Sequence, residues 1–281
     1  MRIEIREDFG AFAARVIIAD EWEGILGKAK KLLQGVCEKF PSGRRVKFLL
    51  TCGGFIQFDW PKHVSASIIG SNLDPNPEAV NALVKEAEKA VRYLLNGGLN
   101  EKLREVTDYV TFGVDSENKD GSIELVSLVD LKTNRFYWTG KSYPTTDQER
   151  ELVRIADLRT HFVELEGVGK VMVLGCHDLN IFSPRSKNAK GWRRKVNGNF
   201  RELAKKERPV CVLHHPHYTV KVRTWCSAWI SLRKSLPFVK WYFGAGRYYK
   251  ENRPREEYDL LEEVLRCTKL GDSMDFICSL S

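Results

Sequence analysis

Apolar and polar residues follow one another along this chain in blocks whose spacing predicts helices and strands in turn. In residues 22–40 and 76–98, apolar side chains recur at every third or fourth position, which is typical of a helix with one buried face. The second of these segments has Pro77 near its start and a pair of glycines at its end, as helix starts and ends prefer. Continuous apolar runs at 46–54 and 108–116 predict buried strands between them.

The second half of the chain continues this alternation. It predicts helices and strands in turn, with strands at 169–180, 209–218, 238–249 and 273–280 and helices at 191–207, 222–236 and 255–267. Strands that alternate with helices predict an α/β fold with a layered sheet and helices on its outer face.

One segment departs from this alternation and changes the predicted sheet. Residues 122–140 read as a hairpin that turns at Lys132–Asn134, so we expect a mixed sheet rather than a wholly parallel one. We see no linker and expect a single α/β domain over residues 1–281. Because only a short helical crossover separates them, the strands that end at Cys176 and His214 should be neighbours in one sheet.

Composition excludes several classes of protein. The chain has 281 residues, of which 43% are hydrophobic and 29% charged, as in ordinary globular proteins. No apolar run approaches the roughly 20 residues that span a bilayer, and the first ten residues carry charges where a signal peptide would be apolar. These features predict a cytoplasmic protein without a membrane partner. The seven cysteines are scattered and form no CxxC pair, so we expect neither a zinc knuckle nor a disulfide framework, and no cofactor.

Charge is unevenly spread along the chain. Of the formal net charge of +8, the segment 185–250 contributes 17 Lys and Arg against 2 Asp and Glu, a local excess of +15. Such a segment predicts an anionic partner, either nucleic acid or a phosphorylated ligand, and its interleaved aromatic residues would suit base stacking. An ordinary solvated helix face beside acidic neighbours is the other interpretation, and the sequence leaves both open.

The strand at 169–180 ends in three reactive side chains, Cys176, His177 and Asp178. A thiol attacks a carbonyl or nitrile carbon only as the thiolate, so it needs a nearby positive charge, for which Lys141 is our candidate. A carboxylate such as Glu149 or Asp115 would then move the proton.

These same residues have purely structural interpretations. Cys176 could simply fill the strand end, and Lys141 could be a solvated loop residue. Asp178 could cap the following turn or pair with Arg185.

A second cluster of polar groups is formed by His214, His215 and His217. If the strand continues to Tyr218, His215 and His217 point to the same side of it. Two uses remain open for these imidazoles. They could hold a metal ion together with the His177–Asp178 pair, as in a metal-dependent phosphoesterase or nuclease, or they could line a polar pocket that binds substrate. The string "HHP" is similar to a strand of calcineurin-like phosphoesterases, whose other metal motifs have no match here.

The order of these motifs resembles that of the nitrilase-like carbon–nitrogen hydrolases. "VTFGVDS" is similar to their glycine-ended strand, "ELVSLVDLKTNRFYWTGKSYPTTDQE" to their hairpin and basic loop, and "GKVMVLGCHDLNIFSPR" to their nucleophile motif. The resemblance implies half of a nitrilase-like α-β-β-α sandwich that can pair as a homodimer. It also implies Cys176 as nucleophile, Lys141 as the catalytic lysine and Glu149 as a downstream acid, with a small-molecule amide as substrate.

Two positions depart from this family. Its catalytic glutamate should close the strand at 46–54, where this chain has Gly53 and Gly54, and Asp59 is about five residues too late in an extended chain. His177 stands where the family has an aromatic residue after the nucleophile.

Two functional hypotheses follow from these observations. In the first, the protein is a thiol-dependent amidase or nitrilase-like hydrolase with Cys176, Lys141, Glu149 and Asp178 in catalysis, or a degenerate member of that fold. Its substrate, an amide or anionic small molecule, would be bound by side chains that surround the strand ends: His177, Arg185, His214, His215 and His217. In the second, residues 185–250 bind nucleic acid or a phosphate ligand and the histidine cluster does metal or acid–base chemistry.

Overall fold

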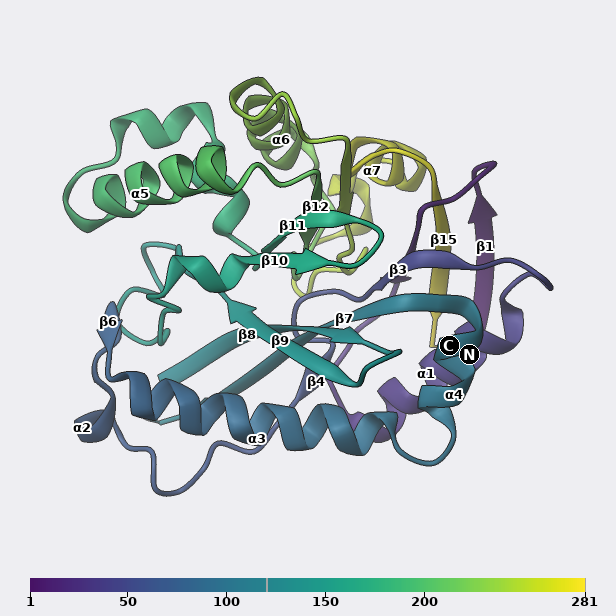
Figure 1. Ribbon diagram of the computed structural model, residues 1–281, viewed down its shortest axis with the longest axis horizontal. Helices are drawn as coiled ribbons and strands as arrows, with labels where there is room; N and C mark the ends of the chain where they lie inside the picture. The colour runs from purple at the N-terminus through teal and green to yellow at the C-terminus, as the bar shows by residue number, and fades with distance from the viewer. Residues whose placement is uncertain (120, 281) are drawn as a thin grey trace.

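The computed structural model describes residues 1–119 and 121–280, which form two packed β-sheets with helices on both outer faces (Figure 1). The larger sheet has eight strands: β1 (Arg2–Glu7), β15 (Ser273–Ser279), β2 (Ala13–Ile18), β3 (Val46–Leu50), β7 (Thr107–Asn118), β8 (Gly121–Asp130) and β9 (Arg135–Gly140) in this order, with β4 (Ile56–Gln57) paired to β7. The second sheet has five: β10 (Phe162–Leu165), β11 (Gly169–Leu174), β12 (Cys211–His214), β13 (Trp241–Gly244) and β14 (Lys269–Leu270). A small ribbon pairs β5 (Gly70–Ser71) with β6 (Asp74–Pro75).

Both sheets are mixed. In the larger one, β15, β2, β3 and β7 run parallel, whereas β1, β8 and β9 are antiparallel to their neighbours. In the second, β11, β12 and β13 are parallel and both edge strands are antiparallel. Leu174 of β11 lies opposite His214 of β12, which confirms the predicted neighbouring strands. The parallel strands therefore bring the chain segments that follow Leu174 and His214 to the same edge of the sheet.

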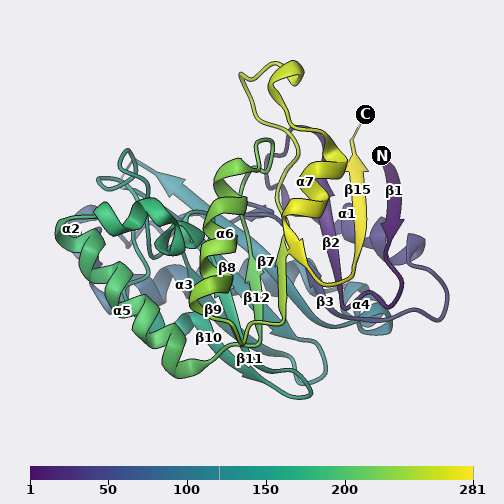
Figure 2. The same cartoon turned by 90° about the horizontal axis from the view of Figure 1, so that it is seen from above.

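The helices cover the two outer faces, so that Figure 1 shows four layers from top to bottom. Against the larger sheet pack α1 (Leu26–Lys39), α3 (Pro77–Leu95) and α4 (Leu99–Val106), and α5 (Gly191–Glu207) and α6 (Arg223–Ser235) cover the second sheet. Figure 2 shows α5 and α6 from above, with α7 (Leu261–Cys267) beside β15. The remaining helical turns are short: α2 (Ala66–Ile69), η1 (Leu158–His161), η2 (Asp178–Phe182), η3 (Pro184–Asn188) and η4 (Arg255–Glu257).

Alternation along the strands explains the layers. In β2, Val16 and Ile18 face the helices α1 and α3, whereas Ala13 and Ile17 face the second sheet. Strand β12 repeats this on the other side, since Leu213 faces the larger sheet and Val212 packs under α5 and α6. Because side chains alternate between the faces of a strand, each sheet buries both of its faces. The layered, mixed α/β fold is as the sequence predicted, and the chain contains both sheets of the α-β-β-α sandwich of which the family resemblance implied half.

A buried ion pair between two neighbouring strands of the larger sheet, β2 and β15, also reaches the second sheet. Arg15 of β2 is fully buried and donates to both carboxylate oxygens of Asp275 at 2.7 Å. It also donates to the carbonyl oxygens of Gly244 in the second sheet and of Leu265 in α7. The guanidinium thus satisfies groups from three elements where no water could reach them.

Some predicted boundaries were wrong. The strand predicted at 209–218 ends at His214, and the one predicted at 238–249 covers only Trp241–Gly244. Because the strand does not continue, the expected alternation does not apply to His215 and His217. The hairpin and the helices at 191–207 and 222–236 lie where the pattern placed them, to within a residue or two. Among the described residues, no helix combines the length and the apolar character needed to cross a bilayer.

Candidate active site

Cys176 lies in a tight turn between β11 and η2, at the edge of the second sheet. Its side chain is half-buried. The preceding Gly175 packs so closely that a Cβ atom there would lie 3.1 Å from the Cα of Lys141 and 3.0 Å from Oδ2 of Asp178. A glycine at this position therefore lets the turn that carries the thiol approach the loop that carries the lysine.

Asp178 links the turn that carries Cys176 to the loop that carries Lys141 by hydrogen bonds. Its Oδ1 accepts hydrogen bonds from the backbone N–H groups of Ser142 at 2.9 Å and Tyr143 at 2.8 Å, and its Oδ2 accepts from Gly175 at 2.9 Å. The carboxylate is fully buried, and all three bonds go to backbone donors. Asp178 therefore holds the position of the Cys176 turn relative to Lys141.

Lys141 follows β9 and is almost completely buried. Its Nζ donates to Oε1 of Glu124 at 2.9 Å and to Oε1 of Gln148 at 2.5 Å. The amide nitrogen of Gln148 donates to the same oxygen of Glu124 at 2.9 Å, which closes a three-membered network. The ammonium is thus held in one place by two side chains that are themselves held.

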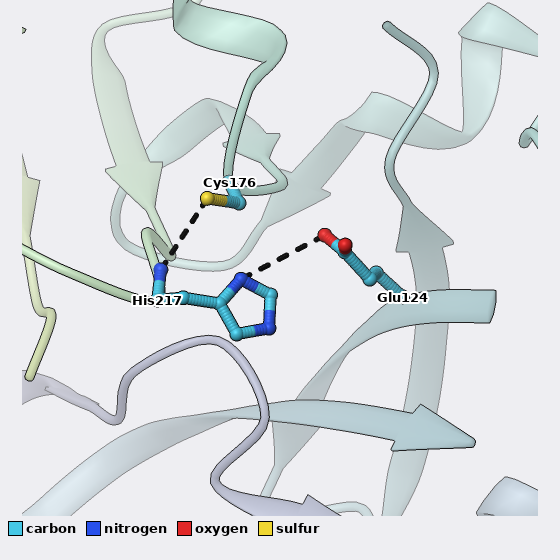
Figure 3. A group of neighbouring side chains, drawn as sticks. All are labelled: Glu124, Cys176 and His217. Carbon is cyan, nitrogen blue, oxygen red and sulfur yellow. Dashed lines mark hydrogen bonds and ion pairs between the residues drawn. The ribbon is translucent and has the colours of Figure 1, made fainter. Parts of the chain in front are cut away.

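His217 joins this group from the loop after β12. Its backbone N–H donates to Sγ of Cys176 at 3.4 Å, and its Nε2 lies 2.7 Å from Oδ2 of Asp115. The other ring nitrogen, Nδ1, lies 3.7 Å from Oε2 of Glu124. Figure 3 shows the imidazole between the thiol and the Glu124 carboxylate. Sγ of Cys176, one ring nitrogen of His217 and one oxygen of Glu124 all lie within 4.8 Å of one another.

The charges of these groups shift one another's pKa values. Burial opposes the charged form of His217, but Glu124 and Asp115 outweigh it and hold the His217 pKa well above its ordinary value. Burial likewise disfavours the charged Lys141, yet Cys176 and Glu124 raise its pKa. The two cations in turn lower the pKa of Glu124 against the effect of its own burial. The site therefore holds two cations and a carboxylate next to the thiol.

Thiol, imidazole and carboxylate are donors that zinc accepts. Here, however, the ammonium of Lys141 already binds Glu124, and its pKa is raised by the charge of Cys176. The positive charge of this site is thus supplied by Lys141 and His217.

His214 and His215 lie at the end of β12, where the sequence placed them, but both are buried. Both are 1% exposed, so neither reaches a ligand at the surface. His214 is hydrogen-bonded to the carbonyl oxygen of Cys176 and to the Tyr242 hydroxyl, each at 2.9 Å, and His215 to the carbonyl oxygen of Thr51 at 2.8 Å. Burial lowers their pKa values to about 3 and about 4, so both rings are neutral. Their hydrogen bonds hold the Cys176 turn and the segment after β3, and their burial keeps them from contacting a substrate.

His177 and Arg185 share an open hollow of about 360 Å³ beside the Cys176 turn. His177 donates from Nδ1 to the carbonyl oxygen of Tyr143 at 2.9 Å, and its ring stacks on that of Tyr143. Arg193 of α5 lines the same hollow. The hollow is thus basic and aromatic, and it adjoins Cys176 through its neighbour His177.

Glu149 is not at Lys141, where the sequence placed it. Its carboxylate accepts from Arg193 at 2.6 Å, and the acid that binds Lys141 is Glu124 instead. The sequence did not single out Glu124 because it lies in an apolar run of β8. Its signal in the sequence was a carboxylate among the apolar residues of a predicted strand. In the structure it lies directly opposite Asp115 of β7.

Several residues of the basic segment 185–250 bind within the protein. Arg193 pairs with Glu149, Arg201 donates to the carbonyl oxygen of Ile181 at 2.6 Å, and Arg208 lies 4.6 Å from the ring centre of Phe238. These contacts account for part of the positive charge without an external anion.

No protein-family model matches the sequence, and no curated protein does. Solved structures do match. An amidase from Nesterenkonia sp. has a TM-score of 0.50 and 13% identity, over 86% of this chain and 78% of that one. A Glu-to-Gln, Cys-to-Ala double mutant of the amidase from Nesterenkonia sp. AN1 in complex with acrylamide has a TM-score of 0.50 and 12% identity, over 83% and 76% of the two chains. The likeness shows that the chain has the fold of this amidase.

Proposed function

We propose that this protein is a thiol-dependent carbon–nitrogen hydrolase with Cys176 as its nucleophile. One observation carries the proposal: a half-buried thiol at a strand end lies within 4.8 Å of an imidazole and a carboxylate, and that carboxylate holds a buried lysine. Fully buried cysteines such as Cys52 and Cys211 are poor nucleophiles, because burial raises the pKa of the Cys52 thiol to about 11 and that of Cys211 still further.

Each charged group near the thiol has a role in this chemistry. The thiolate of Cys176 attacks the carbonyl carbon of an amide and forms a thioester, which water then hydrolyses. The Lys141 ammonium, fixed by Glu124 and Gln148, stabilises the negative charge of the attacking thiolate and of the tetrahedral intermediate. Asp178 holds the Cys176 turn close to the Lys141 loop. These five side chains come from three segments that only the fold brings together: β8, the loop after β9 and the turn after β11.

A small amide is the substrate class that fits best. A Nesterenkonia amidase mutant with the same fold binds acrylamide. The hollow beside Cys176, of about 360 Å³, is of the size that small-molecule sites have. Its basic residues, Arg185 and Arg193, favour an amide that also bears a negative charge. All seven cysteines are free thiols, which suits a reducing compartment such as the cytoplasm.

Alkylation tests the nucleophile before any substrate is known. Iodoacetamide should label Cys176 rapidly, with little labelling of Cys37 and Cys226, whose pKa values burial raises to about 11 and about 12. A metal assay on the same sample should find no stoichiometric metal. An inert Cys176 together with bound metal would refute the thiol mechanism and favour metal-dependent chemistry.

Hydrolysis should then be measured by ammonia release from a panel of small primary amides, with and without a carboxylate. Cys176→Ala should abolish it, and Cys226→Ala is the matched control. Full activity in Cys176→Ala would mean that another group is the nucleophile.

A further inference from the structure

The site has an imidazole beside Gly53 and Gly54, where the family that the sequence resembles has its catalytic glutamate. A Cβ atom at Gly53 would lie 3.0 Å from Nδ1 and Cε1 of the His217 ring, and one at Gly54 would lie 2.9 Å from Oδ2 of Asp115. Gly54 also has a φ of +61°, which side chains rarely adopt. The segment after β3 therefore presents bare backbone to the site, and the His217–Asp115 pair fills the space above it.

The His217 ring has the geometry of a proton carrier. Nε2 is bound to Asp115 at 2.7 Å, which fixes the ring and leaves Nδ1 as the nitrogen that can exchange a proton. Nδ1 faces the side of the site that holds Cys176 and Glu124 (Figure 3). The backbone of the same residue is held by its N–H bond to Sγ and by Arg247, whose N–H donates to its carbonyl oxygen at 2.9 Å. The ring is thus held through Nε2, and the backbone that carries it is held next to the thiol.

No other group that contacts this site is as well placed. Lys141 donates to two acceptors, and its raised pKa keeps it protonated. Glu124 accepts from both Lys141 and Gln148, and the neighbouring cations lower its pKa, which makes it a poor base. His214 and His215 are buried beneath the site.

We propose, resting on the hydrolase function above, that His217 is the acid–base residue of this centre and that Asp115 is its positioning residue. Together with Cys176 they form a Cys–His–Asp arrangement on the fold of the Nesterenkonia amidase. The carboxylate comes from β7, the imidazole from the loop after β12 and the thiol from the turn after β11.

The reaction balances with this single proton carrier. In the resting pair the thiol proton is on Nδ1, and the thiolate of Cys176 attacks the amide carbon while the C=O electron pair moves to oxygen. The electron pair on this oxygen then re-forms the C=O bond, the C–N bond breaks, and Nδ1 gives its proton to the leaving amine. Water then gives a proton to Nδ1 as its oxygen bonds to the thioester carbon. Cleavage of the S–C bond releases the carboxylic acid and restores the thiolate and the imidazolium.

The first test needs no substrate. His217→Gln keeps an amide donor for Asp115 but cannot carry a proton, and His63→Gln, at an exposed histidine, is the control. The charged and titratable groups around His217 are Asp115, Glu124, Cys176 and Arg247, whose Nε donates to the His217 carbonyl oxygen at 3.2 Å, and all of them remain in this variant. At about pH 6, we expect His217→Gln to be alkylated by iodoacetamide at Cys176 about tenfold or more slowly than the wild type, because its thiol proton has lost its acceptor. Equal rates in both proteins would overturn the proposal, whether or not a substrate is found.

The second test separates acid catalysis from a structural role. An anilide nitrogen must be protonated to leave, whereas p-nitrophenolate leaves without a proton. His217→Gln should therefore lose about 10²–10⁴-fold in kcat/KM on p-nitrobutyranilide and far less on p-nitrophenyl butyrate. Asp115→Asn should show the same pattern with a smaller loss. Equal losses on both probes would mean that His217 only holds the site together, which would overturn the assignment.

The two proposals fail in different ways. If the wild type hydrolyses neither probe nor any amide of the panel, the hydrolase function is wrong, and the alkylation rates alone decide whether His217 accepts the thiol proton. If the wild type hydrolyses the anilide and His217→Gln does so equally well, only the His217 assignment is wrong. Thermal melts of each variant show that the comparisons are made on folded protein.

Discussion

Replacement of the buried His214 by Gln should make the protein less sensitive to acid. His214 is 1% exposed, and both of its ring nitrogens have partners. A carbonyl oxygen can only accept, so Nε2 carries the proton that it donates to the Cys176 carbonyl, and Nδ1 then accepts from the Tyr242 hydroxyl. The neutral ring satisfies every group around it, and burial lowers its pKa to about 3.

The sign of the effect follows from where the proton binds. The unfolded chain binds a proton at His214 below about pH 6.5, whereas the folded protein does not until about pH 3. Stability is therefore complete above the unfolded pKa and is lost as the pH falls toward the folded one. At about pH 5, about 1.5 units below the unfolded value, the loss from this residue is about 2 kcal/mol, at about 1.4 kcal/mol per unit.

Urea unfolding at about pH 7 and about pH 5 measures this difference. Glutamine does not titrate, so the change in unfolding free energy between the two pH values should be about 2 kcal/mol smaller in His214→Gln than in the wild type. His217, whose pKa is raised, contributes stability that is lost as the pH rises, but it does so in both proteins and cancels in the comparison. His63→Gln should behave as the wild type. An unchanged pH dependence in His214→Gln would show that this ring is not a neutral buried group.

Other predictions concern the site, the buried ion pair and the basic segment. Cys176→Ala should fold, at a cost of about 1 kcal/mol by thermal melting, and should lose all hydrolysis. Lys141→Ala should also lose activity, and the double variant should be no worse than Cys176→Ala, because residues that act as a unit are non-additive; additive losses in kcat/KM would contradict this. Arg15→Met should cost about 3–5 kcal/mol in urea unfolding, because it leaves the Asp275 carboxylate buried and unpaired, and a loss below 1 kcal/mol would contradict the buried ion pair. If residues 185–208 bind a polyanion, titration at increasing salt should show affinity falling steeply, since counterions are released, whereas flat or absent binding would leave them an ordinary helix face.

The sequence by itself determined the alternation of helices and strands and the mixed strand directions, but not the division of the strands between two packed sheets. Apolar spacing placed the hairpin and the helices at 191–207 and 222–236, because their buried faces repeat with a strong period. It missed β1 and β2, since β1 carries charges along its length and the short apolar run of β2 is interrupted by Arg15. It extended β12 to Tyr218, although the strand ends at His214, because a run of histidines and proline has no period that could mark the end.

The candidate site was only partly visible in the sequence. Cys176 and Lys141 could be named because a reactive residue at a strand end or in a turn stands out locally. Asp115 was named as a possible proton carrier, but Glu124 was not, since the two carboxylates face each other only through the register of β7 and β8. Glu149 was the nearer acid along the chain, but Arg193 of α5 binds it.

Tertiary structure alone decided which histidine meets the thiol. His214, His215 and His217 differ little in sequence, but the chain bends after β12. As a result, the first two rings are buried, and the third lies over Gly53 and Gly54. The two glycines gave no sign of a ligand in the sequence, because what they contribute is space. That space is filled by a side chain more than 160 positions away, and no local pattern encodes such a distance.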